Sequence, residues 1–358
     1  GGLLQLQFAS WWVSTPTFAV LVAVTGFLIL YKTRQLLLGG VFLFVALTLL
    51  GLNGVPPWLA LTSWPLLFLV GFMLSEPLTL PPRKWQRLVV GVVVALLVSL
   101  PFRIENVFYS SPEFALLAGN MVAFILAFRQ RKDLRLTLKG RRPLTPTTDE
   151  FIFTSPETLQ FEAGQYVELT LIGGKTDNRG FRRSFSITNS PGSHELRLGI
   201  KSASPSSTFK QTLCNLPVGA SVQSTGIYGD FVLPKGPAQK LLFIAGGIGI
   251  TPFMSHIVAS AGEGRDIVLL YFVRTPEEAA YADILNKSPI TVHYFAGDDA
   301  TGEFHEASLL TPELLARFVP QANTRTAYIS GPPAMVAAGR AVLRGKVRAI
   351  KTDYFSGY

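Results

Sequence analysis

The chain has 358 residues, of which 48% are hydrophobic and only 15% are charged, and its formal net charge is +9. This length accommodates two or three domains, and so low a charged fraction is unusual for a fully soluble protein. No motif of interleaved aromatic and basic residues accompanies the positive charge, so we expect no nucleic-acid partner.

The first 128 residues contain five apolar segments. They are residues 16–31, 36–51, 57–74, 88–102 and 114–128, and they fall within stretches that have no charged side chain. Each is somewhat shorter than the ~20 residues of a full membrane span, but flanking residues can extend it. We therefore predict a domain of about five transmembrane helices over residues 1–130. Buried helices of a soluble core and a signal peptide are weaker interpretations, because the pattern continues for over a hundred residues with short loops.

Basic residues are concentrated in alternate loops of this region. Lys32 and Arg34 lie in the first loop, residues 83–87 hold three basic residues in the third, and five more follow Phe128. The positive-inside rule then places the N-terminus outside and everything after Phe128 in the cytoplasm. We expect a multi-pass protein of the cell (inner) membrane with the lipid bilayer as a partner. Because the sequence begins with Gly1 rather than methionine, it leaves open whether further spans precede it.

Cysteine and histidine limit the prosthetic groups that the chain can hold. Cys214 is the single cysteine, and the four histidines are His194, His256, His293 and His305. One thiolate supports neither an iron–sulfur cluster nor an internal disulfide, and a transmembrane haem usually takes histidine ligands from within the helices. We expect no haem, iron–sulfur cluster or other metal in this chain.

The second half of the chain predicts two different β architectures. Short strands bounded by turn residues predict an antiparallel β-barrel over residues 131–236. Strands alternating with helices predict a parallel α/β domain over residues 237–358, with Pro234–Pro237 as the hinge. The strands expected in the barrel are 134–138, 150–154, 166–171, 185–188, 195–201 and 221–226. In the α/β domain we expect strands 241–245, 267–272, 291–295 and 326–329, with helices such as 276–285 and 334–343.

A glycine-rich turn follows the first strand of the α/β domain. Gly246, Gly247 and Gly249 allow a sharp turn and close approach to a ligand, while Thr251 is a good helix N-cap and Pro252 a good first helical residue. A helix that begins there offers N–H groups and a positive dipole to a diphosphate. A purely structural turn is the alternative interpretation of the same residues.

A second motif, Arg183-Ser-Phe-Ser186, lies near the end of the predicted barrel. The arginine fork suits a diphosphate, and Phe185 lies on the same strand face, where it can stack on a flat ring. The hydroxyl of Ser186 can bond a ring nitrogen or carbonyl. An ordinary edge strand with a surface arginine remains the alternative.

From about Leu134 to Tyr358 the chain resembles the ferredoxin–NADP reductase family of flavin reductases. Four family motifs occur in order, namely Arg183–Ser186, Gly246–Pro252, Gly331-Pro-Pro333 and Asp353-Tyr-Phe355. The resemblance implies an FAD oxidoreductase that takes hydride from NADH or NADPH, and the predicted spans make it membrane-bound. It also implies that the flavin releases electrons singly, and the sequence leaves open whether the acceptor is a quinone, a second flavin or a partner protein.

The resemblance assigns roles to individual positions. For FAD, Arg183 neutralises the diphosphate with Ser206, Ser207 and Thr208, Phe185 packs on the isoalloxazine, and Ser186 bonds near N5. For the pyridine nucleotide, the diphosphate site comprises Gly246, Gly247, Gly249, Thr251 and Pro252, and the nicotinamide is bordered by Gly331, Pro332 and Met335. Phe355 covers the flavin and Asp353 lies near N5.

The chain departs from the family pattern at two catalytic positions. Ser330 stands where many relatives have cysteine, and Asp353 where they have glutamate, so we expect altered rates rather than lost chemistry. Arg274 could pair with a 2′-phosphate, but the neighbouring Glu277 and Glu278 oppose one, which slightly favours NADH.

Part of the membrane half resembles the end of the membrane subunit shared by sodium-pumping NADH:quinone reductase and the Rnf complex. The similar stretches are Phe72–Pro81 and Ser111–Asn120. The Ser-Gly-Ala-Thr motif that carries a covalent FMN in that family is missing from the sequence. The alternative functions are an ion-translocating redox subunit and a non-catalytic membrane redox sensor.

Overall fold

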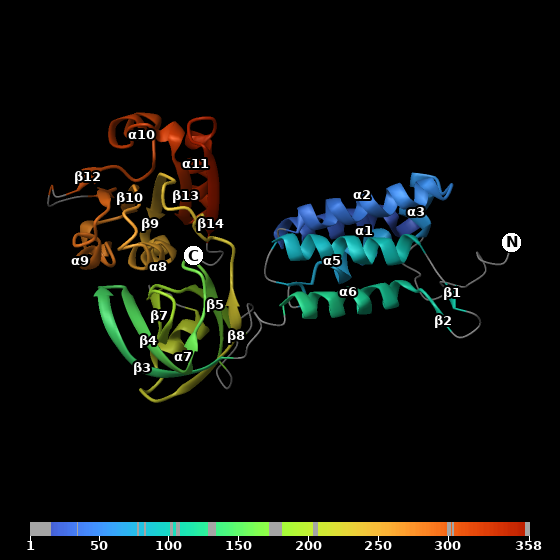
Figure 1. Cartoon of the computed structure of the whole chain (residues 1–358), viewed down its shortest axis with the longest axis horizontal. Coiled ribbons are helices and arrows are strands. Elements are labelled where there is room, and N and C mark those ends of the chain that lie inside the picture. The colour runs from blue at the N-terminus through green and yellow to red at the C-terminus, as the bar shows by residue number, and fades with distance from the viewer. Residues whose placement is uncertain are drawn as a thin grey trace. The chain divides into compact units, whose positions relative to one another are not determined.

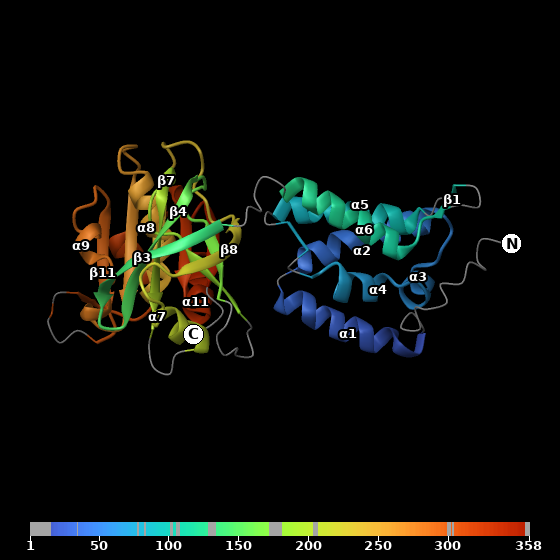
Figure 2. The same cartoon turned by 90° about the horizontal axis from the view of Figure 1, so that it is seen from below.

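The computed structural model describes residues 16–33, 35–76, 79–81, 84–100, 103–104, 108–127, 134–171, 181–202, 207–298, 302 and 304–354. The chain divides into two compact units, Gly1–Gln130 and Arg131–Tyr358, each with its own hydrophobic core. Figures 1 and 2 show that the first unit is helical and that both large sheets belong to the second.

Four continuous helices of 16 or 17 residues form most of the first unit. They are α1 (Pro16–Lys32), α2 (Leu36–Leu52), α5 (Lys84–Ser99) and α6 (Pro112–Ala127). A short hairpin of β1 (Arg103–Ile104) and β2 (Phe108–Tyr109) precedes α6. Within the described residues no single helix is both long and apolar enough to cross a membrane. Only α2 together with α3 (Pro57–Ser63) meets those limits, as a pair bent by 119°.

The third predicted segment, residues 57–74, is not a continuous helix. It consists of α3, a single turn α4 (Leu66–Phe68) and a π-helical turn η2 (Leu69–Met73). The break falls at Trp64, whose φ of −98° and ψ of 148° are extended. Proline disfavours helical conformation in the residue before it, so Pro65 accounts for this break.

Glycines bring the helices of the first unit close together. A Cβ on Gly71 of η2 would lie 2.6 Å from the Cα of Gly26 in α1, so these two backbones touch. A Cβ on Gly91 of α5 would meet the side chain of Leu38 of α2 at 2.7 Å. Small residues at helix crossings allow such close backbone approach.

An antiparallel sheet opens the second unit. Its strands are β3 (Leu134–Thr145), β4 (Thr148–Leu159), β5 (Tyr166–Thr170), β6 (Arg182–Ser186), β7 (Ser193–Lys201) and β8 (Ser221–Tyr228), in the order β6-β5-β8-β3-β4-β7. The inward residues of these strands form one core with helix α7 (Thr208–Cys214). The predicted antiparallel architecture is confirmed, as a half-barrel sheet.

A parallel sheet completes the second unit. Its order is β12-β11-β10-β9-β13-β14, with β9 (Leu241–Gly246), β10 (Ile267–Val273), β11 (Thr291–Ala296), β12 (His305–Glu306), β13 (Thr326–Gly331) and β14 (Ala349–Tyr354). One face packs against α8 (Thr251–Ala259) and α9 (Ala282–Leu285). The opposite face packs against α10 (Pro312–Phe318) and α11 (Pro333–Leu343). The predicted parallel α/β layer is confirmed, although β12, β14 and α10 were not foreseen.

The helix predicted over Pro276–Leu285 is wrong. The segment contains a 3₁₀ turn (Pro276–Glu278), and α9 begins only at Ala282. Between them Tyr281 adopts φ +63°, a left-handed conformation that ends any continuous helix.

The linker between the two sheets is bonded to the parallel-sheet domain. The carbonyls of Pro234 and Gly236 both accept hydrogen bonds from the Arg265 guanidinium, and Tyr328 Oη donates to the carbonyl of Val232 at 2.9 Å. The predicted hinge at Pro234–Pro237 is thus tied to the α/β layer.

Candidate active site

The two central strands of the parallel sheet, β9 and β13, mark the point where its strand order reverses. From β9 the chain proceeds through β10, β11 and β12 on one side, then returns to place β13 and β14 on the other. Open α/β sheets bind ligands at the carboxyl ends of the strands at such a switch point. The glycine turn Gly246–Gly249 and the Ser330-Gly331-Pro332 segment both lie at this edge.

The glycine turn differs from its predicted form. A 3₁₀ turn (Gly247–Ile250) follows Gly246 at once and continues into α8. Thr251 is therefore already helical, with φ −56° and ψ −47°, and its Oγ donates to the carbonyl of Ile248 at 3.0 Å. The prediction that Thr251 caps the helix is wrong, because the glycines begin the helical path earlier. Pro252 lies in the first turn of α8 and is buried.

The three glycines of this turn serve different purposes. A Cβ on Gly249 would overlap the carbonyl of Ser330, and one on Gly246 would overlap the sulfur of Met335, so both positions are dictated by packing. Gly247 has φ +52°, and a Cβ there would meet nothing within 4 Å. Gly247 is thus the glycine whose surroundings are open to a ligand.

Two of the predicted catalytic residues are brought together by the sheet. Ser330 of β13 pairs in register with Ala245 of β9 on one side and with Asp353 of β14 on the other. Ser330 is fully buried, and its Oγ has no hydrogen-bond partner in the described part of the chain. Ser330 thus lies beside the glycine turn, with Asp353 as its in-register neighbour on β14. Met335 and Pro332 contact this turn at Gly246.

The arginine motif occupies β6, as predicted. Phe185 packs at a ring-centroid distance of 6.0 Å from Phe209 of α7, and the Arg183 guanidinium lies 5.3 Å from the centroid of the same ring. Ser186 is 3% exposed, and its Oγ has no hydrogen-bond partner among the described residues. Phe209, which the sequence did not single out, therefore supports both FAD-motif side chains.

The start of α7 provides hydroxyl groups near this strand. Ser207 is the N-cap and accepts a hydrogen bond from the backbone N–H of Lys210 at 3.3 Å. Thr208 Oγ is buried without a hydrogen-bond partner in the described structure. Ser206 and Phe355, two further predicted site residues, lie outside the described residues.

Arg274 is exposed directly after β10, where the predicted adenosine site lies. Of the two nearby glutamates, Glu278 pairs with Lys201 of β7 at 3.0 Å. Its charge is thus engaged, which weakens the expectation that this carboxylate opposes a 2′-phosphate.

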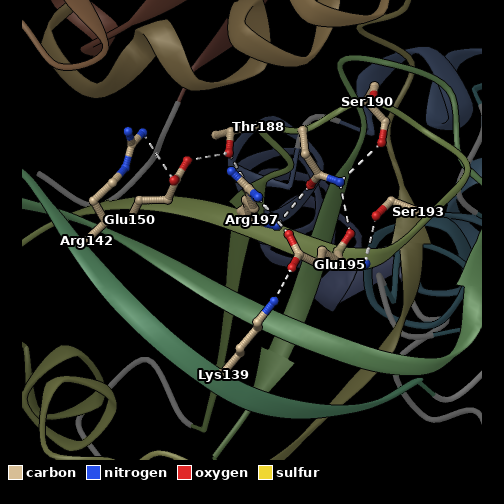
Figure 3. Close-up of polar contacts among 9 residues, drawn as sticks. Lys139, Arg142, Glu150, Thr188, Ser190, Ser193, Glu195 and Arg197 are labelled. Atoms are coloured by element: carbon tan, nitrogen blue, oxygen red, sulfur yellow. Dashed lines mark hydrogen bonds and ion pairs between the residues drawn. The ribbon is translucent and has the colours of Figure 1, made fainter. Parts of the chain in front are cut away.

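A buried polar cluster joins the two sheets near this site. Glu150 of β4 is 2% exposed; its carboxylate lies 3.3 Å from an Arg142 nitrogen and accepts a 3.4 Å hydrogen bond from Thr188, as Figure 3 shows. Arg142 also lies 3.6 Å from Asp283 of α9. Burial, together with the Glu150 charge, raises the pKa of Tyr281, so this phenol remains protonated. No motif in the sequence indicated this cluster.

The residues present fit FAD and a pyridine nucleotide. Ser186, Thr208 and Ser330 each hold a buried hydroxyl without a protein partner among the described residues, and such groups are uncommon in folded proteins unless a ligand or water satisfies them. Arg183 supplies a cation on the strand of Ser186, and Gly247 leaves open space at the helix start. FAD would be held by Arg183, Ser186 and Thr208, and the nucleotide by the glycine turn at Gly247 and by Ser330.

Comparison with known proteins relates the second unit to flavin reductases. Residues 243–341 match the oxidoreductase NAD-binding domain. Ferredoxin–NADP reductase B of Sorangium cellulosum (strain So ce56) is 31% identical over 163 residues, which cover 44% of this chain and 64% of the relative. The Amycolatopsis cytochrome P450 reductase GcoB superposes with a TM-score of 0.55 at 26% identity, covering 63% of this chain and 70% of that structure.

One structural likeness extends over both units. The flavohemoglobin from Malassezia yamatoensis gives a TM-score of 0.59 and covers 95% of this chain and 85% of that structure, but its identity of 18% supports only a likeness of fold. The chain spans about half the length of the first curated relatives, 46% and 48%. The family model, the Sorangium relative and the GcoB likeness together show that the second unit is similar in sequence and fold to NAD(P)H-dependent FAD oxidoreductases of the ferredoxin–NADP reductase type.

Proposed function

We propose that the chain is a membrane-anchored flavin reductase that oxidises NAD(P)H and delivers electrons to an acceptor at or across the membrane. The main observation in support of a reductase is that the second unit contains both the Arg183–Ser186 motif and the glycine turn Gly246–Pro252. Ser186 and Ser330 each place a buried hydroxyl, with no hydrogen-bond partner among the described residues, beside a motif typical of FAD and pyridine-nucleotide sites, respectively.

When bound, FAD supplies the chemistry of accepting hydride from a nicotinamide and releasing electrons one at a time. The chain's own residues bind and orient the reactants. Arg183 provides charge for a diphosphate, Phe185 an apolar face, and Ser186 a hydrogen bond to a ring atom. The Ser330 hydroxyl and the Asp353 carboxylate present polar groups at the nicotinamide end of the site.

The distribution of apolar side chains supports membrane residence of the first unit. Large apolar residues are exposed along its helices, including Leu21 (59%), Phe27 (57%) and Phe44 (73%), although its interior already buries apolar side chains such as Phe42 and Leu66. Such a surface is costly in water and is stabilised by lipid. A 17-residue helix is about 25 Å long, a few ångströms short of the ~30 Å hydrocarbon layer, which flanking residues can complete.

Polar groups inside the first unit are satisfied by backbone atoms. Gln86 Nε2 of α5 donates to the carbonyl of Leu126 at 2.8 Å, Ser110 Oγ to that of Leu97 at 2.8 Å, and Ser75 Oγ to that of Gly71 at 2.8 Å. Exposed apolar and internally bonded polar side chains are the arrangement that a bilayer favours. With the basic residues after Phe128, this supports a multi-pass protein of the inner membrane whose second unit is cytoplasmic.

The flavohemoglobin likeness raises haem binding as a second candidate for the first unit. That structure contains FAD and heme. Residues 1–130 of this chain contain no histidine and no cysteine, the two commonest anchors of haem iron. We therefore favour an apolar, lipid-facing unit, and a Soret absorption band in the purified protein would support haem instead.

The proposal is tested in membranes. The full chain is expressed and the membranes are washed with alkaline carbonate; we expect the protein to remain in the pellet, whereas release into the wash would contradict anchoring. The same membranes are then given NADH or NADPH with a water-soluble quinone as acceptor. Reduction of quinone above the level of membranes lacking the chain supports the reductase. No increase with the quinone, ferricyanide or a flavin acceptor would contradict it and favour a redox sensor.

A further inference from the structure

One buried hydrogen bond links the nucleotide-binding helix to the FAD-motif segment. Ser255 of α8 is fully buried, and its Oγ donates to the backbone carbonyl of Asn189 at 2.8 Å. Asn189 belongs to the antiparallel-sheet half of the second unit and Ser255 to the parallel-sheet half. The bond thus crosses the boundary between the two halves.

The acceptor end of this bond is held in place by the Asn189 side chain. Its Oδ1 accepts from the backbone N–H of Arg197 at 2.9 Å, and its Nδ2 donates to the backbone carbonyl of Glu195 at 2.9 Å. Both partners belong to β7, whose network with Lys139 is drawn in Figure 3. The Asn189 carbonyl is therefore fixed on the barrel rather than carried by a free loop.

The donor and acceptor each lie close to one of the two ligand motifs. Asn189 is three residues after Ser186, the last residue of β6, and Ser255 is four residues after Thr251, the first residue of α8. Short stiff segments thus connect the bond to the FAD strand and to the glycine turn. We propose that Ser255 is a positioning residue that sets the distance between the bound flavin and nicotinamide, an inference that rests on the proposed function.

Close packing beside the bond leaves little slack between the two halves. A Cβ on Gly199 of β7 would lie 2.8 Å from the Thr251 methyl and 2.7 Å from Tyr281 Oη, so side chains from the nucleotide half press directly on the β7 backbone. The Lys201–Glu278 ion pair holds the end of the same strand. Loss of the Ser255 hydroxyl leaves this packing but removes a directional contact that lies close in sequence to both motifs.

The consequence is expected in hydride transfer rather than in ligand binding. Hydride transfer requires close approach of the reacting atoms, and small misplacements slow such steps by an order of magnitude or more. Ser255→Ala is expected to lower the rate of flavin bleaching by NADH in a single turnover about 10-fold. The dissociation constants of FAD and NADH should change less than about 2-fold, because no group of this chain that is proposed to contact either molecule is altered.

The control is Ser288→Ala in the same half. Ser288 also donates through its hydroxyl to a backbone carbonyl, that of Leu285, at 2.6 Å, but this bond stays within the end of α9. Ser288→Ala should therefore leave the rate of flavin bleaching at the wild-type value. If Ser255→Ala does not fold, Ser255→Cys replaces it, because a thiol keeps the volume and is only a weak donor.

A second readout needs no cofactor. In the FAD-free full chain, amide hydrogen exchange of the peptide containing residues 187–190 should become about 10-fold faster in Ser255→Ala, which corresponds to ~1.4 kcal/mol, and stay unchanged in Ser288→Ala. Asn189→Ala should slow hydride transfer through the same contact, so its effect and that of Ser255→Ala should be less than additive in the double variant.

The outcomes are separable. If wild-type flavin is not bleached by either nucleotide, the proposed function fails. If wild-type flavin is bleached and Ser255→Ala exchanges faster but reacts at the wild-type rate, the bond is merely structural and the positioning role is overturned. Unchanged exchange and unchanged rate also overturn it. A slower rate with an increased isotope effect from 4-deuterated NADH supports it.

Discussion

Replacing His256 should change how the stability of the second unit depends on pH. His256 is fully buried in α8, and its ring lies among those of Phe231, Phe243, Phe253 and Tyr328 at centroid distances of 5.8 to 6.4 Å. Burial is the main cause that lowers its pKa from 6.5 to about 3, and the positive charges of Lys351 and Arg265 act in the same direction. The folded protein therefore keeps this imidazole neutral.

The sign and size of the effect follow from proton linkage. Between the folded pKa of about 3 and the unfolded value of 6.5, the unfolded chain binds one proton that the folded chain does not. The stabilisation is complete above pH 6.5 and is lost as the pH falls toward 3, at about 1.4 kcal/mol per pH unit. From a pH well above 6.5 down to about pH 4.5, this one residue should cost about 2.7 kcal/mol of unfolding free energy.

The assay compares the wild type with His256→Leu, which removes the titrating group but keeps an apolar side chain. The full chain in detergent is titrated with urea at several pH values, and unfolding is followed by hydrogen exchange of the α8 peptide. Tryptophan fluorescence is unsuitable, since all five tryptophans lie between residues 11 and 85. The unfolding free energy of the variant should fall less steeply on acidification than that of the wild type. The difference in slope should correspond to one proton, about 1.4 kcal/mol per pH unit. Identical slopes for the two proteins would refute the reasoning.

Three further substitutions test the packing and the site. Gly164→Ala should destabilise the second unit by at least about 2 kcal/mol more than Gly219→Ala in urea titration. Both glycines have positive φ, +90° for Gly164 and +88° for Gly219. Only a Cβ on Gly164 would collide with other atoms. Equal losses would show that backbone strain alone matters. Gly71→Ala should lower the midpoint temperature of unfolding of the first unit, followed by tryptophan fluorescence. Gly40→Ala should not lower it, because a Cβ there meets nothing within 4 Å. Equal midpoints for the two variants would contradict the close helix crossing. Asp353→Asn should slow single-turnover flavin bleaching about 10-fold with FAD binding retained; a wild-type rate would remove this carboxylate from the site.

The architecture of the second unit was predictable because its two sheets have different sequence patterns. Short strands between turn residues indicate antiparallel pairing, and buried strands alternating with helices indicate a parallel layer. β14 was missed because Ala349–Tyr354 alternates weakly and carries Lys351 and Asp353. The helix expected over residues 276–285 failed because periodicity does not reveal the left-handed conformation of Tyr281.

The site residues proposed from the sequence are those whose side-chain type by itself suits a ligand. Arginine, glycine and serine in fixed order indicate FAD and nucleotide sites, and the structure places Ser330 and Asp353 in register. Ser255 and Asn189 could not be foreseen, because their bond joins residues 66 positions apart and depends on how the two sheets pack. Thr251 was misassigned as a cap because the 3₁₀ turn of the glycines begins the helical path before it.

The most direct test of the central claim is anaerobic reduction of the purified, FAD-loaded chain in lipid nanodiscs by NADH and then by NADPH, with the visible flavin band recorded over time. Bleaching within one turnover by one or both nucleotides, followed by recovery of the band when a quinone is added, is the predicted result. A flavin band that stays oxidised with both nucleotides would contradict the reductase and leave a protein that binds its ligands without transferring hydride.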